Sequence, residues 1–86
     1  MRVELLVTRD SSACRKAELV WQSICEKNNL TLRVIDDAGP QGRQVLARLA
    51  LNALPAILLD GRLVAVGVQT QNQAMELLRT AGKRQP

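Results

Sequence analysis

Two cysteines are the residues of this chain most able to do covalent chemistry. The 86 residues contain Cys14 and Cys25 and no histidine. Without histidine there is no Ser-His-Asp triad, no histidine-assisted cysteine and no histidine metal ligand. A structural zinc site usually needs four cysteine or histidine ligands, and this chain offers two cysteines. The sequence therefore excludes metal hydrolases and histidine-dependent proteases, and it leaves thiol chemistry to consider.

Cys14 lies where a thiol can be activated. A helical pattern begins directly after Ser11 and Ser12, so Cys14 is the second or third helical residue, depending on which serine is the cap. Free amides, the helix dipole and the neighbouring Arg15 and Lys16 favour a thiolate there. Packing against the preceding strand would disfavour the charge. At this stage the sequence fits both a reactive thiol and an inert packed one.

Cys25 belongs to the apolar face of the same helix, and we expect it to be a core residue. Helical spacing places it on one stripe with Ala17, Val20, Trp21 and Ile24. Eleven residues separate the two cysteines, which is about 16 Å of helical rise at roughly 1.5 Å per residue. A disulfide requires Cα atoms within about 7 Å, so the two cysteines cannot pair within one intact helix. Trp21 is likewise predicted to be structural.

Composition and charge narrow the function classes. The chain has one tryptophan, no tyrosine and no phenylalanine, which removes the stacking platforms of single-strand nucleic-acid binders. The net charge is +4, but the basic residues are scattered, which indicates a mixed solvated surface or a binding surface for an acidic protein partner. No apolar run approaches the roughly 20 residues of a membrane span, and no leader pattern is present. We expect a cytoplasmic protein without bound metal or cofactor, either a monomer or a weak homodimer.

The periodicities predict seven elements in the order β-α-β-α-β-β-α. The first βαβ unit requires parallel strands, and Asp60-Gly61 predicts an antiparallel hairpin in the second half. We therefore expect an α/β fold with a four-stranded mixed sheet flanked by three helices, in one domain over 1–82 with a frayed basic tail at 83–86. Thr70 and Gly82 are expected to begin and end the last helix. The expected strands are 2–8, 30–35, 56–59 and 63–68, and the expected helices are 13–27, 44–51 and 71–81.

Two segments and a glycine resemble a known family. The stretch 8–17, TRDSSACRKA, resembles the glutaredoxin pattern T-K-x-C-P-x-C-x-K-A, and the segment 54–57, LPAI, resembles its V-P-x-hydrophobic segment. Gly67 matches the glycine that ends the fourth strand of that family. Over nearly the whole chain, the element order is similar to the thioredoxin-like fold in its short glutaredoxin-like form. The resemblance implies a cis Pro55, and a Leu54 backbone that docks a peptide or glutathione.

The chain departs from that family at the nucleophile. Ser11 stands where the first cysteine belongs, and Cys14 takes the second position, so the dithiol mechanism is unavailable. What the resemblance implies is single-thiol exchange at Cys14 with a protein thiol or with glutathione. The stretch 66–70 lacks the Gly-Gly-x-Asp pattern with which glutaredoxins hold glutathione. The alternative is a non-catalytic docking module that lost the nucleophile.

Overall fold

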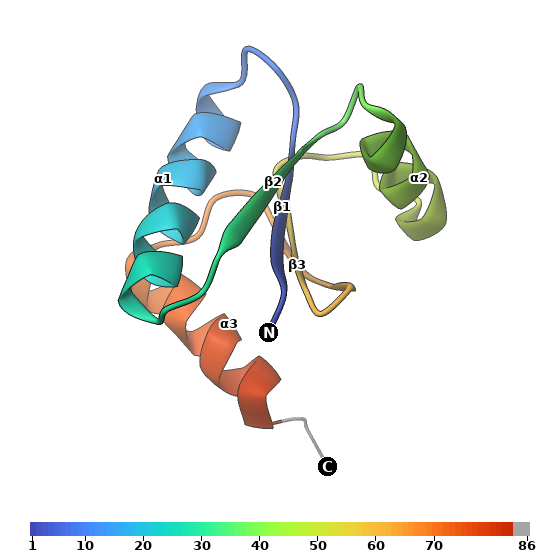
Figure 1. The fold of residues 1–86 in the computed structure, drawn as a ribbon. Coiled ribbons are helices and arrows are strands. Elements are labelled where there is room, and N and C mark those ends of the chain that lie inside the picture. Colours follow the sequence, from blue (N-terminus) through green and yellow to red (C-terminus); the bar gives the residue numbers. More distant parts are fainter. Residues whose placement is uncertain (84–86) are drawn as a thin grey trace.

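The computed structural model describes residues 1–83 and shows seven elements around one sheet (Figure 1). Their order is β-α-β-α-β-β-α, which confirms the predicted α/β architecture. The strands are β1 (Val3–Val7), β2 (Leu32–Asp36), β3 (Ala56–Leu59) and β4 (Arg62–Val66). The helices are α1 (Ser12–Lys27), α2 (Pro40–Leu49) and α3 (Gln71–Lys83). No helix within these residues is both long and apolar enough to span a membrane.

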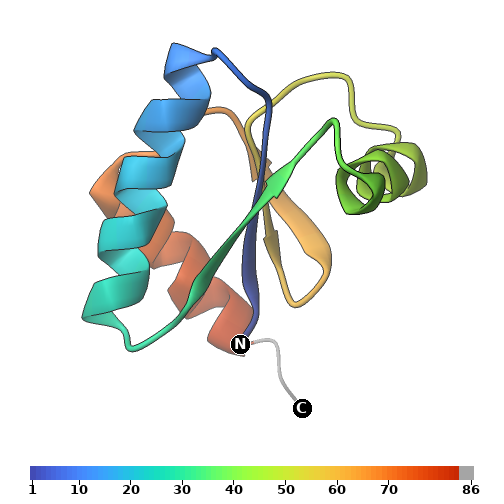
Figure 2. The ribbon, with the colours of Figure 1, turned by 45° about the horizontal axis from the view of Figure 1, so that its top comes forward.

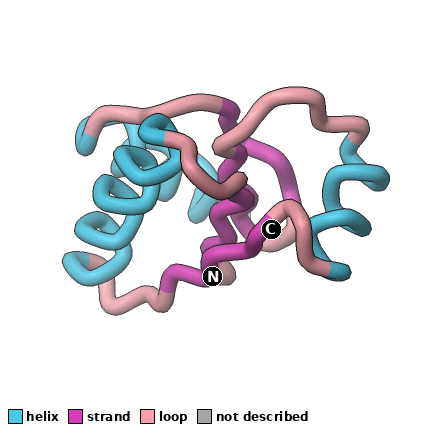
Figure 3. Tube along the Cα trace, turned by 90° about the horizontal axis from the view of Figure 1, so that it is seen from above, coloured by secondary structure: helices cyan, strands magenta, loops and turns pink. Residues whose placement is uncertain are grey.

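The sheet is mixed, with strand order β2-β1-β3-β4. β1 runs parallel to β2, as the α1 crossover requires, and antiparallel to β3. Two layers cover it. Helices α1 and α3 lie on one face and α2 lies on the other (Figures 1 and 2). Seen from above, the strands lie between the two helical layers (Figure 3).

Because β1 is covered on both faces, its side chains enter two separate cores. Val3 and Leu5 pack with α1 and α3 in the larger core, whereas Leu6 packs with Ile35 and Ala56 under α2. Nearly continuous burial along a central strand is expected when helices cover both faces. The larger core also contains the buried residues Ala17, Trp21, Ile24, Cys25, Ile57, Leu59, Ala74 and Leu78.

One buried hydrogen bond connects α1 to the segment between β4 and α3. Nε1 of Trp21 donates a hydrogen bond of 3.0 Å to Oε1 of Gln69, which lies between β4 and α3. Trp21 is fully buried and Gln69 is 8% exposed. The periodicity places Trp21 in the core but gives no sign that Gln69 is buried beside it, because the partners are 48 residues apart in the sequence.

Helix α2 begins four residues earlier than predicted, at Pro40 instead of Gln44. The Gly and Pro residues of the segment 36–42 are typical of a turn, yet Pro at the first helical position is favourable, since its fixed φ suits a helix start. Gly42 serves packing: a Cβ there would lie 2.1 Å from the backbone oxygen of Asp36. The glycine therefore lets α2 approach the end of β2.

The last helix also departs from the prediction. α3 continues through Lys83, so Gly82 lies inside the helix and does not end it. The predicted tail otherwise falls on residues 84–86, outside the described residues. The hairpin prediction is confirmed, because Asp60 and Gly61 have φ values of 51° and 82°. Positive φ at both central positions is what a type I′ turn needs.

We expect Gln69→Ala to lower the free energy of unfolding by about 1–3 kcal/mol, because it leaves the buried indole N–H of Trp21 without an acceptor. Urea unfolding followed by the fluorescence of Trp21 measures this. Gln44→Ala, on the exposed side of α2, is the matched control and should change the free energy by less than about 0.5 kcal/mol. Equal effects of the two substitutions would show that the hydrogen bond contributes nothing.

Candidate functional site

Ser11 is the cap of α1. Its backbone is extended, with φ −112° and ψ 118°, and its Oγ accepts a hydrogen bond of 3.1 Å from the amide of Cys14. Of the two serines considered for the cap, Ser11 is therefore the one used, and Cys14 is the third residue of the helix. The Ser11 hydroxyl is engaged in capping, and no histidine exists to activate it. Ser11 holds the helix start and is not equipped to act as a nucleophile.

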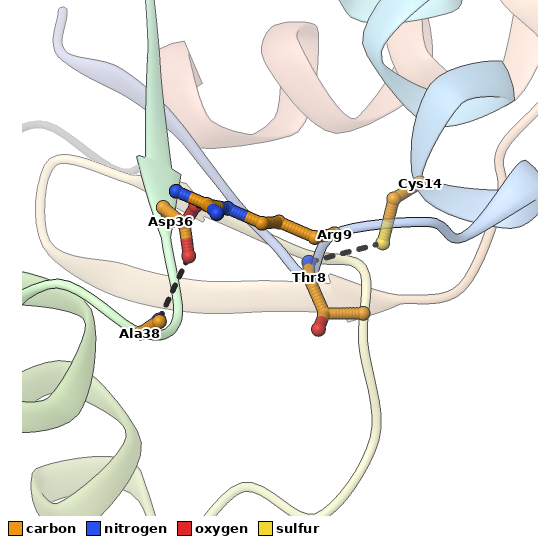
Figure 4. Close-up of polar contacts among 5 residues, drawn as sticks. All are labelled: Thr8, Arg9, Cys14, Asp36 and Ala38. Atoms are coloured by element: carbon orange, nitrogen blue, oxygen red, sulfur yellow. Dashed lines mark hydrogen bonds and ion pairs between the residues drawn. The ribbon is translucent and has the colours of Figure 1, made fainter.

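The sulfur of Cys14 points from α1 back toward the end of β1 (Figure 4). The amide of Thr8 donates a hydrogen bond of 3.4 Å to Sγ. Cys14 as a whole is 3% exposed. The site thus holds the sulfur in a fixed position, largely shielded from solvent.

The structure brings the predicted docking residues together: Leu54, Pro55 and Gly67. The Leu54–Pro55 peptide bond is cis in the structure, and Pro55 is fully buried while Leu54 is half-buried. The amide of Gly67 donates a hydrogen bond of 2.8 Å to the carbonyl of Pro55. Gly67 has φ +93° and open space around its Cβ position, so backbone conformation and not crowding requires a glycine there.

Thr8 connects the sulfur to this docking segment. Its backbone amide contacts Sγ of Cys14, and its side chain points the other way (Figure 4). Thr8 and Leu54 both line a pocket of about 350 Å³. The remaining lining residues come from the loop before α2, from α2 itself and from the loop that follows it: Asp37, Leu46, Leu51, Asn52 and Ala53. Nothing in the sequence patterns indicated this pocket or the role of Thr8, because both depend on how the loops meet.

The loop between β1 and α1 is fastened at its other side by Arg9. Nε of Arg9 lies 3.2 Å from Oδ2 of Asp36, at the end of β2. Oδ1 of Asp36 accepts a hydrogen bond of 2.8 Å from the amide of Ala38. The Ala38 amide and the Arg9 guanidinium together hold the pKa of Asp36 below its usual value. Asp10, between Arg9 and the cap, has φ 57°, a conformation that aspartate tolerates better than most residues.

Cys25 lies apart from this site. It is 1% exposed within the larger core, and burial raises the pKa of its thiol. This agrees with its prediction as a core residue. Both cysteines are free thiols. Among the residues that the structure describes, no three histidine, cysteine, aspartate or glutamate side chains are grouped so as to hold a metal ion.

We expect Asp36→Asn to destabilise the protein at neutral pH and to have no effect in strong acid. A carboxyl group whose folded pKa is lowered stabilises the fold above its unfolded pKa of about 3.9, and this stability is lost as the pH falls through the folded value. Unfolding free energies of both proteins between pH 7 and pH 2 measure the difference. Asp10→Asn in the same loop is the control, and a pH-independent difference for Asp36→Asn would contradict the assignment.

Comparison with known proteins identifies the type of fold that this chain adopts. No protein-family model and no curated protein matches this chain. Among solved structures, thioredoxin 1 of Thermosipho africanus TCF52B is 14% identical with a TM-score of 0.72, and covers 96% of each chain. Fasciola hepatica thioredoxin is 15% identical with a TM-score of 0.60, over 91% of this chain and 80% of its own. The glutaredoxin-like NrdH-redoxin of Escherichia coli is 16% identical with a TM-score of 0.52, over 100% and 97%. The chain has the thioredoxin-like fold.

Proposed function

We propose that this chain is a thioredoxin-like protein of thiol–disulfide exchange that acts through the single thiol of Cys14. The observation that carries the proposal is the hydrogen bond from the Thr8 amide to Sγ in the first turn of α1. This hydrogen bond adds one N–H group to the favourable field of the helix N-terminus. The structural neighbours support the same class, because they are thioredoxins and a redoxin described as having a thioredoxin-like activity profile.

The chemistry needs a disulfide from a client and a thiol from a reductant. The thiolate of Cys14 attacks one sulfur of the client disulfide, a new S–S bond forms between Cys14 and the client, and the other client sulfur leaves as a thiolate. An external thiolate, of a protein or of glutathione, then attacks the client sulfur of this mixed disulfide and releases Cys14 as thiolate. The reductant is thereby left in a disulfide with the client. Ser11 cannot resolve the mixed disulfide, so the external thiol is required.

We propose that the client lies against Leu54 and Pro55 during this exchange. The carbonyl of Pro55 already accepts a hydrogen bond from the amide of Gly67, whereas no hydrogen bond within residues 1–83 engages the backbone of Leu54. The carbonyl and amide of an extended client segment pair with such a free backbone in the manner of an added strand. A cytoplasmic location is proposed with this function, because an exchangeable single thiol needs a reducing environment.

We expect the Cys25→Ser protein to form a mixed disulfide with 5,5′-dithiobis(2-nitrobenzoate) at least about tenfold faster than the Cys14→Ser protein does. Each variant keeps one buried thiol: Cys14, which is 3% exposed, or Cys25, which is 1% exposed. The two thiols are therefore matched in exposure and differ in their surroundings. Release of the coloured thiolate measures both rates. Equal rates that track global unfolding, measured by urea dependence, would contradict exchange at Cys14.

A docking module without chemistry is the second candidate function, and two observations favour it. Ser11 uses its hydroxyl as a helix cap in the place of a nucleophilic thiol. Cys14 is 3% exposed, which limits attack on a bulky disulfide. In this alternative the Leu54–Pro55 segment binds a protein partner noncovalently, and the net charge of +4 favours an acidic one. A monomer or a weak homodimer is proposed for either function.

For the docking module, we expect peptides selected from a random displayed library on the reduced wild-type protein to bind Cys14→Ser with affinities within about threefold. The sulfur takes no part in noncovalent docking, whereas Leu54→Asp introduces a charge into the docking segment and should abolish binding. Fluorescence anisotropy of labelled peptides measures all three proteins. Loss of binding in the Cys14→Ser protein alone, with its fold intact by circular dichroism, would rule out the docking module.

A further inference from the structure

We infer that the pocket lined by Thr8 and Leu54 receives a lysine or arginine side chain from the client segment. The inference rests on the proposed function, because the segment concerned is the one that brings a disulfide to Cys14. It goes further by naming the chemistry that the site selects next to that disulfide. Thr8 sets the location: its amide contacts Sγ of Cys14 and the same residue lines the pocket. We therefore expect the side chain in the pocket to belong to a client residue about one or two positions from the client cysteine that exchanges with Cys14.

The walls of the pocket fit an aliphatic chain. Leu46, Leu51 and Leu54 line it, and the same three side chains pack from behind on the core under α2. They are therefore held by the fold and do not need to be ordered by a ligand. A volume of about 350 Å³ exceeds the roughly 150 Å³ of a cavity that binds benzene. One long side chain fits within this space.

The rim of the pocket selects positive charge. Among the residues that the structure describes, Asp37 is the only charged one that lines the pocket. Its neighbour Asp36 is held by Arg9 and by the amide of Ala38. These two carboxylates and one guanidinium leave a local charge of −1, opposite in sign to the +4 of the whole chain. Lysine and arginine combine an aliphatic stem with a positive end, and so they match both the leucine walls and the Asp37 rim.

The experiment measures binding of peptides that cannot exchange. Capped pentapeptides carry serine in place of cysteine, followed by lysine, norleucine or glutamate, and amide shifts of the reduced wild-type protein report binding. We expect lysine to bind about threefold tighter than norleucine and about tenfold tighter than glutamate at low salt, with shifts centred on Thr8, Leu51 and Leu54. The advantage over norleucine should shrink in about 0.5 M salt, because screening weakens the attraction of the half-buried Asp37 carboxylate.

Two variants decide whether Asp37 is responsible. Asp37→Asn should bind lysine and norleucine equally, whereas Glu18→Gln, the same change of charge on the exposed side of α1, should keep the threefold difference. Norleucine binding as tightly as lysine to the wild-type protein would overturn the inference in favour of a neutral occupant. Shifts outside the pocket, or no binding at all, would also overturn it.

The outcome is separable from that of the proposed function. The peptides contain no sulfur, so an inert Cys14 does not alter this result, and a basic preference would then describe a docking site. Exchange at Cys14 together with equal binding of all three peptides would refute the pocket alone.

Discussion

The burial of β1 on both faces is the constraint on which the rest of the structure depends. Its parallel pairing with β2 and antiparallel pairing with β3 place it inside the sheet, and each face then needs its own helical layer. The strand ends between these layers, so the residue that follows, Thr8, lies at their boundary. Its amide meets the sulfur of Cys14 on the side of α1, and its side chain meets the pocket on the side of α2. The site is therefore built where the two layers join.

The hydroxyl of Ser11 acts on the site through the helix that it caps. Serine is a strong N-cap, and Ser11 gives its oxygen to the amide of Cys14. This fixes the first turn of α1 and with it the direction of the sulfur. The thiol of Cys14 is thus well positioned and poorly exposed. This combination suits slow, selective exchange, and it also suits a site in which the sulfur only packs.

The structural features that follow from short-range sequence patterns could be predicted. Those that depend on contact between distant segments could not. The periodic helix around Trp21 and Cys25, the order of elements and the Asp60-Gly61 turn follow from short-range patterns, and the structure confirms them. The early start of α2 was missed because Pro and Gly usually indicate a loop, while here Gly42 is needed for close approach to β2. The pocket and the Thr8 amide could not be predicted, because loop packing and backbone hydrogen bonds leave no trace in residue types.

The loop between β1 and α1, which connects Thr8 to the Ser11 cap, is held weakly on one side. The Arg9–Asp36 ion pair has side chains that are 83% and 39% exposed, and such pairs contribute little in water. The Ser11 cap is the stronger restraint, but it belongs to the helix and need not break when residues 9 and 10 move. Residues 9 and 10 are therefore the weakly held part of the segment between Thr8 and the helix that carries Cys14, whose side chain is 3% exposed. Exposed segments held by one ion pair open locally at low free energy, whereas the sheet and its two cores open only with the whole fold.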